Sequence, residues 1–457
     1  MKSKFYRVCL LVFICFLLVN LRDNVNLANS QQYDNSLIEQ RIQEGCNFII
    51  DHLWDNNYGG FFKTCESNGS YPVTLKYASF QAFSALAFYN LYLNLHDQVY
   101  WDLADSAINF LVDHLWDALY GGFFHCSDRK GNVSNVDYSK LPSIKDAGYQ
   151  AWCAFALFKS FDLTKRNEIL ILANKTLNFL IEKLWNKTYF IFSKLSEADG
   201  SNPEDITISY YDFWIISALI KGYHFFSNDL FLGYALATIN YLFKYLWNSI
   251  NQCFYYSSFL NGTLIDKSTY LVVQTSALLA LNDLYLLTGN ETYYQYIQNI
   301  SNSLIYHLWD PLNNGFFDIA YSDGTNSSKN PSIQATQIYS FTLSELSNNT
   351  ERFTSNYTIA NLNFIIEKMW DSTYGGYFYA YSQDGTPISF EKWVIDQVWV
   401  LYALSLLVSG RFDANLIILF IVIAVVCVSG WLLYKFHKKF SLKILIASFF
   451  SELKKHL

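Results

Sequence analysis

The stretch HLWDNNYGGFF at residues 52–62 decides the fold, because variants of it occur six times along the chain. Each variant combines an apolar helix end, a tryptophan, a turn rich in glycine or asparagine, and a short aromatic run. The tryptophans recur every 61 to 69 residues and are Trp54, Trp116, Trp185, Trp247, Trp309 and Trp370. Such regular spacing indicates internal duplication of one supersecondary unit.

The hydrophobic pattern around this phrase predicts two helices in every unit. Before the tryptophan, apolar residues recur at intervals of three and four, as in Phe48, Ile49 and Leu53. After the aromatic run comes a two-residue hairpin turn such as Asn68-Gly69, and then a second helix that is rich in alanine. Neither helix of a pair can bury its apolar face alone, so the six pairs must pack together. We therefore predict an all-α fold, a closed (α/α)6 barrel with the second helices inside and short β-hairpins around one mouth.

The two ends of the chain have the composition of membrane-targeting segments. A basic start followed by a short apolar run predicts a signal peptide or N-terminal hydrophobic segment. Near the other end, the apolar stretch Leu416-Tyr434 is long enough to span a bilayer, and lysines follow it at once. Lysine-rich flanks stay cytoplasmic, which predicts a single-pass type I protein at the cell surface with the barrel outside. The expected segments are 1–30 (signal), 31–411 (barrel), 412–435 (transmembrane helix) and 436–457 (basic cytoplasmic tail).

Charge and cysteine content exclude several classes of function. The formal net charge is −7 and no basic stripe interleaves the aromatic residues, which argues against a nucleic-acid partner. The barrel region has an odd number of scattered cysteines and no metal-ligand spacing, so we expect buried thiols, no metal and no cofactor. These cysteines are Cys46, Cys65, Cys126, Cys153 and Cys253. The N-x-S/T sequons all lie in the predicted extracellular region, which agrees with that topology.

A second signature repeats where each second helix begins. Lysine stands five residues before glutamine in four units: Lys76/Gln81, Lys145/Gln150, Lys329/Gln334 and Lys392/Gln397. The other two units have Thr207/Asp212 and Thr269/Gln274. Two residues further on stand Phe83, Trp152, Trp214, Ser276, Thr336 and Trp399. If the second helices open onto the mouth, these positions form three rings around a funnel, with lysine outermost and the aromatic residues deepest.

The string Gly-Gly-Phe, Asp/Asn-Gly, Lys and Gln, repeated on helix pairs, resembles the N-acylglucosamine 2-epimerase superfamily and, more broadly, the six-hairpin glycosidase-like barrels. The resemblance covers about residues 35–411 and implies a carbohydrate-active barrel with a sugar as its partner. The epimerases place an arginine two residues after the first signature glutamine, where this chain has Phe83. Their base histidines lie near a GHxxE-like motif that is absent here. These departures argue against epimerase chemistry.

The candidate site residues fall into two groups. The repeated side chains either stabilise the wall or bind substrate in the funnel, and the aromatic ones either pack as core or stack on sugar rings. The substrate-binding candidates are Lys76, Lys145, Lys392, Gln81, Gln150, Gln397, Phe83, Trp152, Trp214 and Trp399. Chemistry needs asymmetry, so the catalytic candidates are residues that break the repeat. They are Asp212, Asp396, Asp146 and His125, the last of which follows GGFF where we align Lys63, Ser193, Tyr256, Asp318 and Tyr379 in the other units.

Three functions fit these residues. The first is a surface glycoside hydrolase, which needs two carboxyls, or a hydratase of unsaturated sugars, which needs one acid/base. Asp212 and Asp396 would then face each other across the funnel, with one pKa raised by burial. The second is a sugar epimerase or isomerase that uses His125 or His224. The third is a non-catalytic glycan-binding or cell-envelope protein.

Overall fold

The structure is a computed structural model that describes residues 35–133, 144–348 and 355–407. The predicted signal peptide (1–30), the transmembrane helix (412–435) and the tail (436–457) therefore lie outside the described residues. Contacts divide the chain into one unit up to Leu404 and another from Ser405 onward. The first unit contains the repeats.

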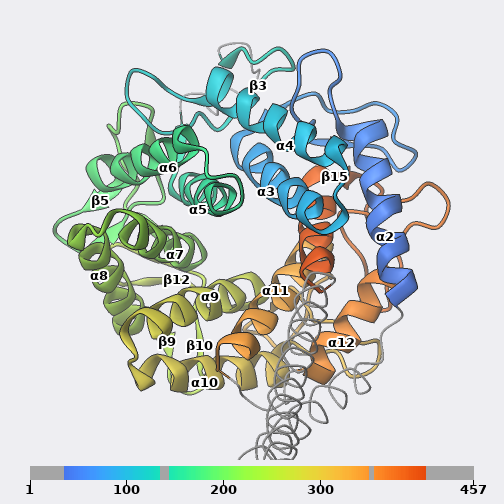
Figure 1. The fold of residues 1–457 in the computed structure, drawn as a ribbon. Helices are drawn as coiled ribbons and strands as arrows, with labels where there is room; N and C mark the ends of the chain where they lie inside the picture. Colours follow the sequence, from blue (N-terminus) through green and yellow to red (C-terminus); the bar gives the residue numbers. More distant parts are fainter. Residues whose placement is uncertain (1–34, 134–143, 349–354, 408–457) are drawn as a thin grey trace, which may run out of the picture. The chain divides into compact units, whose positions relative to one another are not determined.

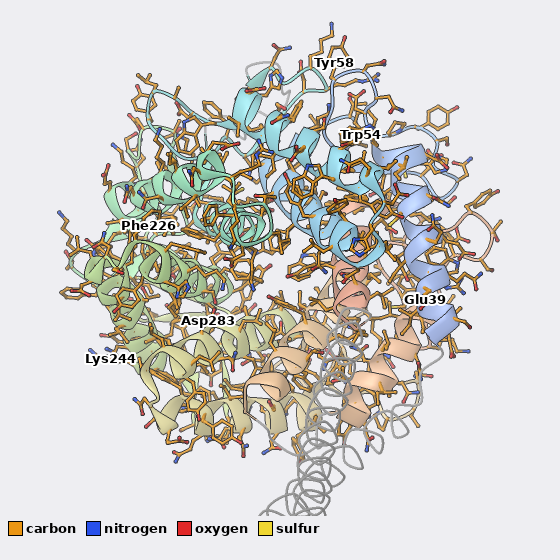
Figure 2. The ribbon with its side chains drawn as sticks, in the orientation of Figure 1. Glu39, Trp54, Tyr58, Phe226, Lys244 and Asp283 are labelled. Atoms are coloured by element: carbon orange, nitrogen blue, oxygen red, sulfur yellow. The ribbon has the colours of Figure 1, made fainter. Side chains whose placement is uncertain are left out.

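Two concentric layers of helices form a ring, as the repeat predicts (Figure 1). The outer helices are α2 (Asn35–Phe48), α4 (Gln98–Phe110), α6 (Asn167–Phe179), α8 (Asp229–Tyr245), α10 (Glu291–Leu308) and α12 (Ser355–Asn363). The inner helices are α3 (Ala78–Leu95), α5 (Ala147–Thr164), α7 (Ser209–Phe226), α9 (Leu271–Thr288), α11 (Pro331–Asn348) and the unlabelled helix Val394–Leu407. Side chains fill the space between the layers and extend into the ring (Figure 2). The structure confirms the (α/α)6 barrel.

Short strands connect the units and close the ring. The strand before each inner helix pairs with the strand that follows the turn of the next unit. The pairs are β2 (Lys76–Tyr77) with β3 (Cys126–Ser127), β4 (Ile144–Asp146) with β7 (Leu195–Glu197), β8 (Ile206–Ile208) with β11 (Ser257–Phe259), and β13 (Thr269–Tyr270) with β14 (Ile319–Ala320). Between units five and six the pairing is a single bridge from Lys329 to Tyr381. The last strand, β15 (Lys392–Trp393), pairs with β1 (Thr64–Cys65) of the first unit, so the barrel is closed and is not an open solenoid.

The Trp-Gly-Gly phrase makes the sharp turn from the outer helix into the strand. In the second unit, outer helix α4 ends in a π-helical turn over Leu111–Leu115, and Trp116 then bridges back to Phe123. Gly122 has φ of +73°, a conformation that glycine adopts without steric cost. A Cβ there would lie 2.9 Å from the Phe179 ring and 3.0 Å from the amide oxygen of Gln150, so the turn also needs the missing side chain for space.

One described helix, Leu271–Thr288, is long and apolar enough to cross a membrane. It is inner helix α9, and most of its residues are buried in the barrel, so it is a core helix of this fold. The five cysteines of the barrel region are free and buried, as predicted.

Candidate active site

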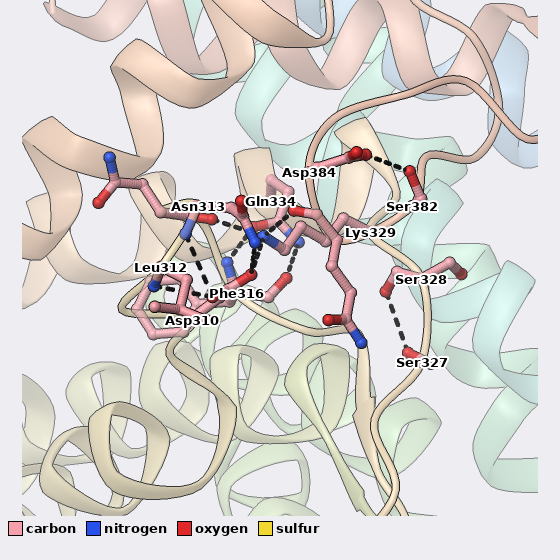
Figure 3. A network of polar contacts seen from close by, with 12 residues as sticks. Asp310, Leu312, Asn313, Phe316, Ser327, Ser328, Lys329, Gln334, Ser382 and Asp384 are labelled. Atoms are coloured by element: carbon pink, nitrogen blue, oxygen red, sulfur yellow. Dashed lines mark hydrogen bonds and ion pairs between the residues drawn. The ribbon is translucent and has the colours of Figure 1, made fainter.

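The repeated lysines belong to the barrel wall. Each is fully buried, and its ammonium group pairs with the aspartate that follows the tryptophan of the same unit. The distances are 3.0 Å for Lys76–Asp55, 2.7 Å for Lys145–Asp117, 2.9 Å for Lys329–Asp310 and 2.6 Å for Lys392–Asp371. Each lysine also donates to a carbonyl of the turn, as Lys329 does to Asn314 at 2.6 Å. Figure 3 shows Lys329 with Asp310 and the polar residues around them. A buried charge is tolerated when it is paired and hydrogen-bonded in this way.

The repeated glutamines hold the aromatic strand. Gln81 accepts a hydrogen bond from the N–H of Phe61 at 2.7 Å and donates to its carbonyl at 2.8 Å. The same pair of bonds joins Gln150 to Phe123, Gln274 to Phe254, Gln334 to Phe316 and Gln397 to Tyr377. The structure therefore contradicts the prediction that Lys76, Lys145, Lys392, Gln81, Gln150 and Gln397 form substrate-binding rings. Their polar atoms are used inside the wall.

The wall contains a paired substitution that is visible in the sequence. Where asparagine replaces the aspartate after the tryptophan, in Asn186 and Asn248, threonine replaces the lysine, in Thr207 and Thr269. Each unit thus has both charges or neither. This is the pattern expected if an unpaired charge at either position is costly. The lysine could have been assigned to the wall from this signal alone.

Asp212 also belongs to the wall. It occupies the glutamine position of the third unit, is 1% exposed, and accepts a hydrogen bond from the Thr207 hydroxyl at 2.6 Å. Burial raises its pKa well above the ordinary value, so a protonated side chain is favoured there. The prediction that Asp212 faces Asp396 across a funnel is contradicted, because the glutamine position points into the wall.

The aromatic residues two positions further on form a packed layer at the centre of the ring. Phe83 lies with its ring centroid 4.7 Å from Trp399, 5.1 Å from Trp152 and 6.0 Å from Trp214. We call these four residues the aromatic layer. Trp214 and Trp399 are each 1% exposed, and Phe83 is buried as well. These three offer no free ring face to a sugar, contrary to prediction, and only Trp152 is half-buried.

The mouth above this layer is lined by the residue nine positions after each tryptophan. The carbonyls of several of these residues accept the first N–H of a neighbouring inner helix, for example Ala78 to His125 at 3.1 Å and Ala147 to Lys194 at 2.8 Å. This geometry assigns Lys194, not Ser193, to the third unit. The set is Lys63, His125, Lys194, Tyr256, Asp318 and Tyr379.

Two carboxyl groups meet on one side of the mouth. Asp318 accepts hydrogen bonds from the N–H of Asn330 at 3.1 Å and the amide of Gln334 at 3.2 Å. Asp396 is 1% exposed, and neither of its oxygens has a hydrogen bond of normal geometry among the described residues. Burial raises its pKa to about 7, although the nearby Ser332 and Asn330 side chains oppose that shift. Burial also raises the pKa of Asp318, and the charge of Asp396 adds to the effect. Asn330 lies beside both carboxyls, since its N–H donates to Asp318 and its side chain is near Asp396, so the two share one region of the mouth.

Asp146 lies elsewhere on the mouth, among tyrosines. It caps α5 by accepting the N–H of Tyr149 at 3.1 Å. Burial raises its pKa to about 7, against the opposing effects of backbone N–H groups, Lys194 and Tyr211. The ring of Tyr211 packs over Gly148, where a Cβ would approach it to 2.2 Å. Asp146 is therefore a third carboxyl at the mouth, with a clear structural role as a cap.

His125 is the one described histidine at the mouth. Its ring lies between Tyr77 and Tyr149, at centroid distances of 5.0 and 4.5 Å. Burial, helped by the charge of Lys63, lowers its pKa to about 4, so the ring is neutral at pH 7. His224 is exposed in the last turn of α7, at the opposite end of the barrel. The structure therefore does not bring together the two histidines of the epimerase hypothesis.

Three of the predicted catalytic candidates, Asp396, Asp146 and His125, lie at the mouth, and their catalytic role stays a prediction. Asp318 has the same aligned position as His125 but was not among the candidates. The signal was available, because Asp318 is the only acid at that position of the repeat. Within the described ranges, no group of three or more His, Cys, Asp or Glu side chains has the arrangement of a metal site.

Comparisons with known proteins agree with this architecture. No family model matches the chain. A stretch of 77 residues is 35% identical to N-acylglucosamine 2-epimerase of Rattus norvegicus and spans 17% of each protein. Among solved structures, a cellobiose 2-epimerase from Bacillus thermoamylovorans has a TM-score of 0.69 at 16% identity, over 81% of this chain and 99% of that one. A GH76 α-mannanase from Bacteroides thetaiotaomicron has a TM-score of 0.66 at 13% identity, over 83% and 97%.

At these identities the structural matches establish the fold, and the sequence match is short. Both nevertheless point to the same group of proteins as the repeat signature does. In fold and in repeat signature, this chain is similar to the N-acylglucosamine 2-epimerase superfamily and the six-hairpin glycosidase-like barrels.

Proposed function

We propose that this protein is a carbohydrate-active enzyme of the glycoside hydrolase or hydratase type, with Asp318 and Asp396 as its acid/base pair. The observation that carries the proposal is Asp396, a carboxyl buried at the mouth whose two oxygens lack hydrogen bonds of normal geometry among the described residues. The Ser332 and Asn330 side chains lie beside this carboxyl without forming hydrogen bonds of normal geometry, so its capacity to accept hydrogen bonds is not filled. A hydroxyl-rich ligand would supply the missing bonds.

The pair has the chemistry that glycosidic bond cleavage needs. One carboxyl must be protonated to give a proton to the leaving oxygen, while the other is ionised. Neighbouring carboxyls in a desolvated site do not both ionise at neutral pH, because like charges raise each other's pKa. Because the pKa of Asp318 is raised well above its ordinary value and that of Asp396 to about 7, the pair retains at least one proton near pH 7. Asp146 could assist from the other side of the mouth, where tyrosine hydroxyls surround it.

A direct test uses the full-length chain in neutral detergent and a library of α- and β-linked oligosaccharides, including mannans. Release of reducing ends reports hydrolysis, and loss of ultraviolet absorbance from unsaturated oligosaccharides reports hydration. We expect Asp396→Asn to lower kcat by about 10²- to 10⁴-fold, the usual contribution of a general acid or base. Asp212→Asn is the matched control, since Asp212 is equally buried but turned into the wall.

Two results would oppose the proposal. Turnover that Asp396→Asn leaves unchanged would remove the pair from the mechanism. Saturable oligosaccharide binding without any turnover by the wild-type protein would favour the non-catalytic glycan-binding alternative.

The match to N-acylglucosamine 2-epimerase favours a second candidate, epimerisation of an N-acylated sugar with His125 as a base. Such a reaction exchanges the proton next to the carbonyl with solvent. Incubation with N-acetylmannosamine in D₂O followed by proton NMR would detect the exchange, and His125→Asn would abolish it. His125 is the only described histidine at the mouth, and this makes the carboxyl mechanism the better-supported one.

The location of the enzyme is part of the same proposal. The lysines after Leu416-Tyr434 support a membrane anchor with the barrel on the extracellular side. Sequons such as Asn68, Asn132 and Asn261 lie at accessible turns of the structure and are open to glycosylation. On intact cells, an external peptide glycosidase should shift the mobility of the protein, and a cytoplasmic barrel would show no shift.

A further inference from the structure

The inner helices carry a second set of charged residues, at the end of the barrel away from the mouth. Lys159 on α5 and Lys221 on α7 each stand seven residues after a tryptophan of the aromatic layer, Trp152 and Trp214. Seven residues are about two helical turns, so these lysines lie on the same inward face, about 10 Å further along the axis. Asp283 has the corresponding position on α9 and lies on the inner side of the ring, where it is labelled in Figure 2.

The two lysines lack a close counter-ion. Among the described residues, neither ammonium group has an ion pair within 4 Å or a hydrogen bond, unlike the four lysines of the wall. Asp283 acts on Lys159 only at longer range. Lys221 lies 5.3 Å from the centroid of the Phe155 ring, which positions it without neutralising it. Asp162 also acts on Lys159 but is itself paired with Lys165 at 3.6 Å, so Lys159, Lys221 and Asp283 leave a net charge of +1 among the described residues at this end.

The surroundings of the pair are partly desolvated. Lys159, Lys221 and Asp283 are all half-buried, so a small ion can reach them from solvent. Burial lowers the pKa of Lys159 to about 8, and the charge of Lys221 lowers it further. Ser217 stands one turn before Lys221 on α7, is 1% exposed, and its hydroxyl has no partner among the described residues. A buried hydroxyl and two ammonium groups that form no ion pair among the described residues thus lie on the adjacent helices α5 and α7.

We infer that Lys159 and Lys221, with Ser217, form a binding site for a tetrahedral phosphate dianion at the far end of the barrel, separate from the carboxyl site at the mouth. A phosphate offers several oxygens to donors from two helices at once, and its charge relieves the repulsion between the lysines. Free phosphate and the phosphate group of a sugar phosphate have the same chemistry in this respect.

The test measures thermal unfolding of the full-length chain in neutral detergent against increasing concentrations of inorganic phosphate, and separately of glucose 6-phosphate. A ligand that binds only the folded state raises the unfolding temperature in a saturable manner. We expect this rise in the wild-type protein with at least one of the two probes, and the probe that responds identifies the source of the phosphate. In the K159Q/K221Q variant the affinity should fall at least about tenfold, or 1.4 kcal/mol.

The matched control is K175Q. Lys175 is an exposed lysine of the outer helix α6, and its removal changes the net charge without touching the site. K175Q should respond to phosphate as the wild type does. If the double variant fails to fold, K221Q alone serves, with a smaller loss of affinity. An equal response in all variants, or no saturable response in the wild type, overturns the proposal.

Discussion

At the residue scale, the wall of the barrel depends on charges that occur in pairs. Lys145 and Asp117 are buried together, and units three and four have neither charge, with Asn186 and Thr207 in the third. A half-formed pair is the costly state, because it leaves one buried charge without compensation. The units with and without this ion pair therefore differ by a double substitution, in which aspartate becomes asparagine and lysine becomes threonine.

A double-mutant cycle can measure this coupling. Lys145→Thr alone should lower the free energy of unfolding by about 3–5 kcal/mol, because it leaves Asp117 buried and unpaired. Adding Asp117→Asn should restore most of the loss, since the result is the arrangement of unit three. Urea unfolding followed by circular dichroism gives the values. The same cycle at the exposed pair Lys165–Asp162 should show a coupling of at most about 1 kcal/mol, and equal couplings at both pairs would contradict the argument.

At the element scale, each outer helix must turn abruptly into a strand, and the glycines of the turn make this geometry accessible. Gly122 combines a positive φ with close contacts to Phe179 and Gln150. Gly233, near the start of outer helix α8, has neither property, because a Cβ added there would meet no atom within 4 Å. Gly122 is therefore a position where the backbone conformation requires glycine, whereas Gly233 is a position where glycine only lowers helix propensity.

Alanine substitutions at these glycines should have opposite effects. Gly122→Ala should destabilise the barrel by more than about 1 kcal/mol, because alanine is strained at positive φ and would clash with Phe179. Gly233→Ala should stabilise it by about 0.5–1 kcal/mol through lower entropy of the unfolded chain and better helix propensity. Midpoints of chemical unfolding give both values. Destabilisation by both substitutions to the same extent would show that the turn has no special requirement.

At the scale of the whole molecule, the barrel concentrates buried carboxyls at its mouth, and this couples stability to pH. Asp146 and Asp396 have pKa values raised from 3.8 to about 7. Between about pH 3.8 and 7, each carboxyl is protonated in the folded state but ionised in the unfolded state. Each therefore contributes to the free energy of unfolding at low pH, and this contribution is lost as pH rises toward 7. His125, with its pKa lowered to about 4, acts in the opposite sense between about pH 4 and 6.5, because only the unfolded chain takes up its proton.

The contribution of Asp396 can be isolated with Asp396→Asn. Between pH 4 and 7, the stability of the variant relative to the wild type should rise by up to about 1.4 kcal/mol per pH unit, the limit for one proton. Above pH 7 the difference should level off. Thermal or urea unfolding over this pH range gives the difference curve, with Asp212→Asn measured alongside. A flat difference for Asp396→Asn would mean that its carboxyl is not protonated in the folded state.

The sequence by itself determined the architecture, because the pattern that predicts helix, turn, strand and helix occurs six times along the chain. Periodicity and turn chemistry are local, and closure follows from the need of every pair to bury an apolar face. The same regularity misled the interpretation of the site. Repeated lysines, glutamines and aromatics looked like rings around a funnel, although they form the wall and the aromatic layer.

Only the tertiary structure decided which polar residues remain for chemistry. Asp212 and Asp396 are both aspartates at the start of inner helices, one residue apart in the repeat. On a helix, one residue is a rotation of about 100°, which turns Asp212 into the wall and leaves Asp396 at the mouth beside Asp318. Asp318 comes from a different unit, and the sequence could not show that the two carboxyls meet. The packing of unit six against unit five brings these partners together, and that packing is a tertiary property that no single repeat contains.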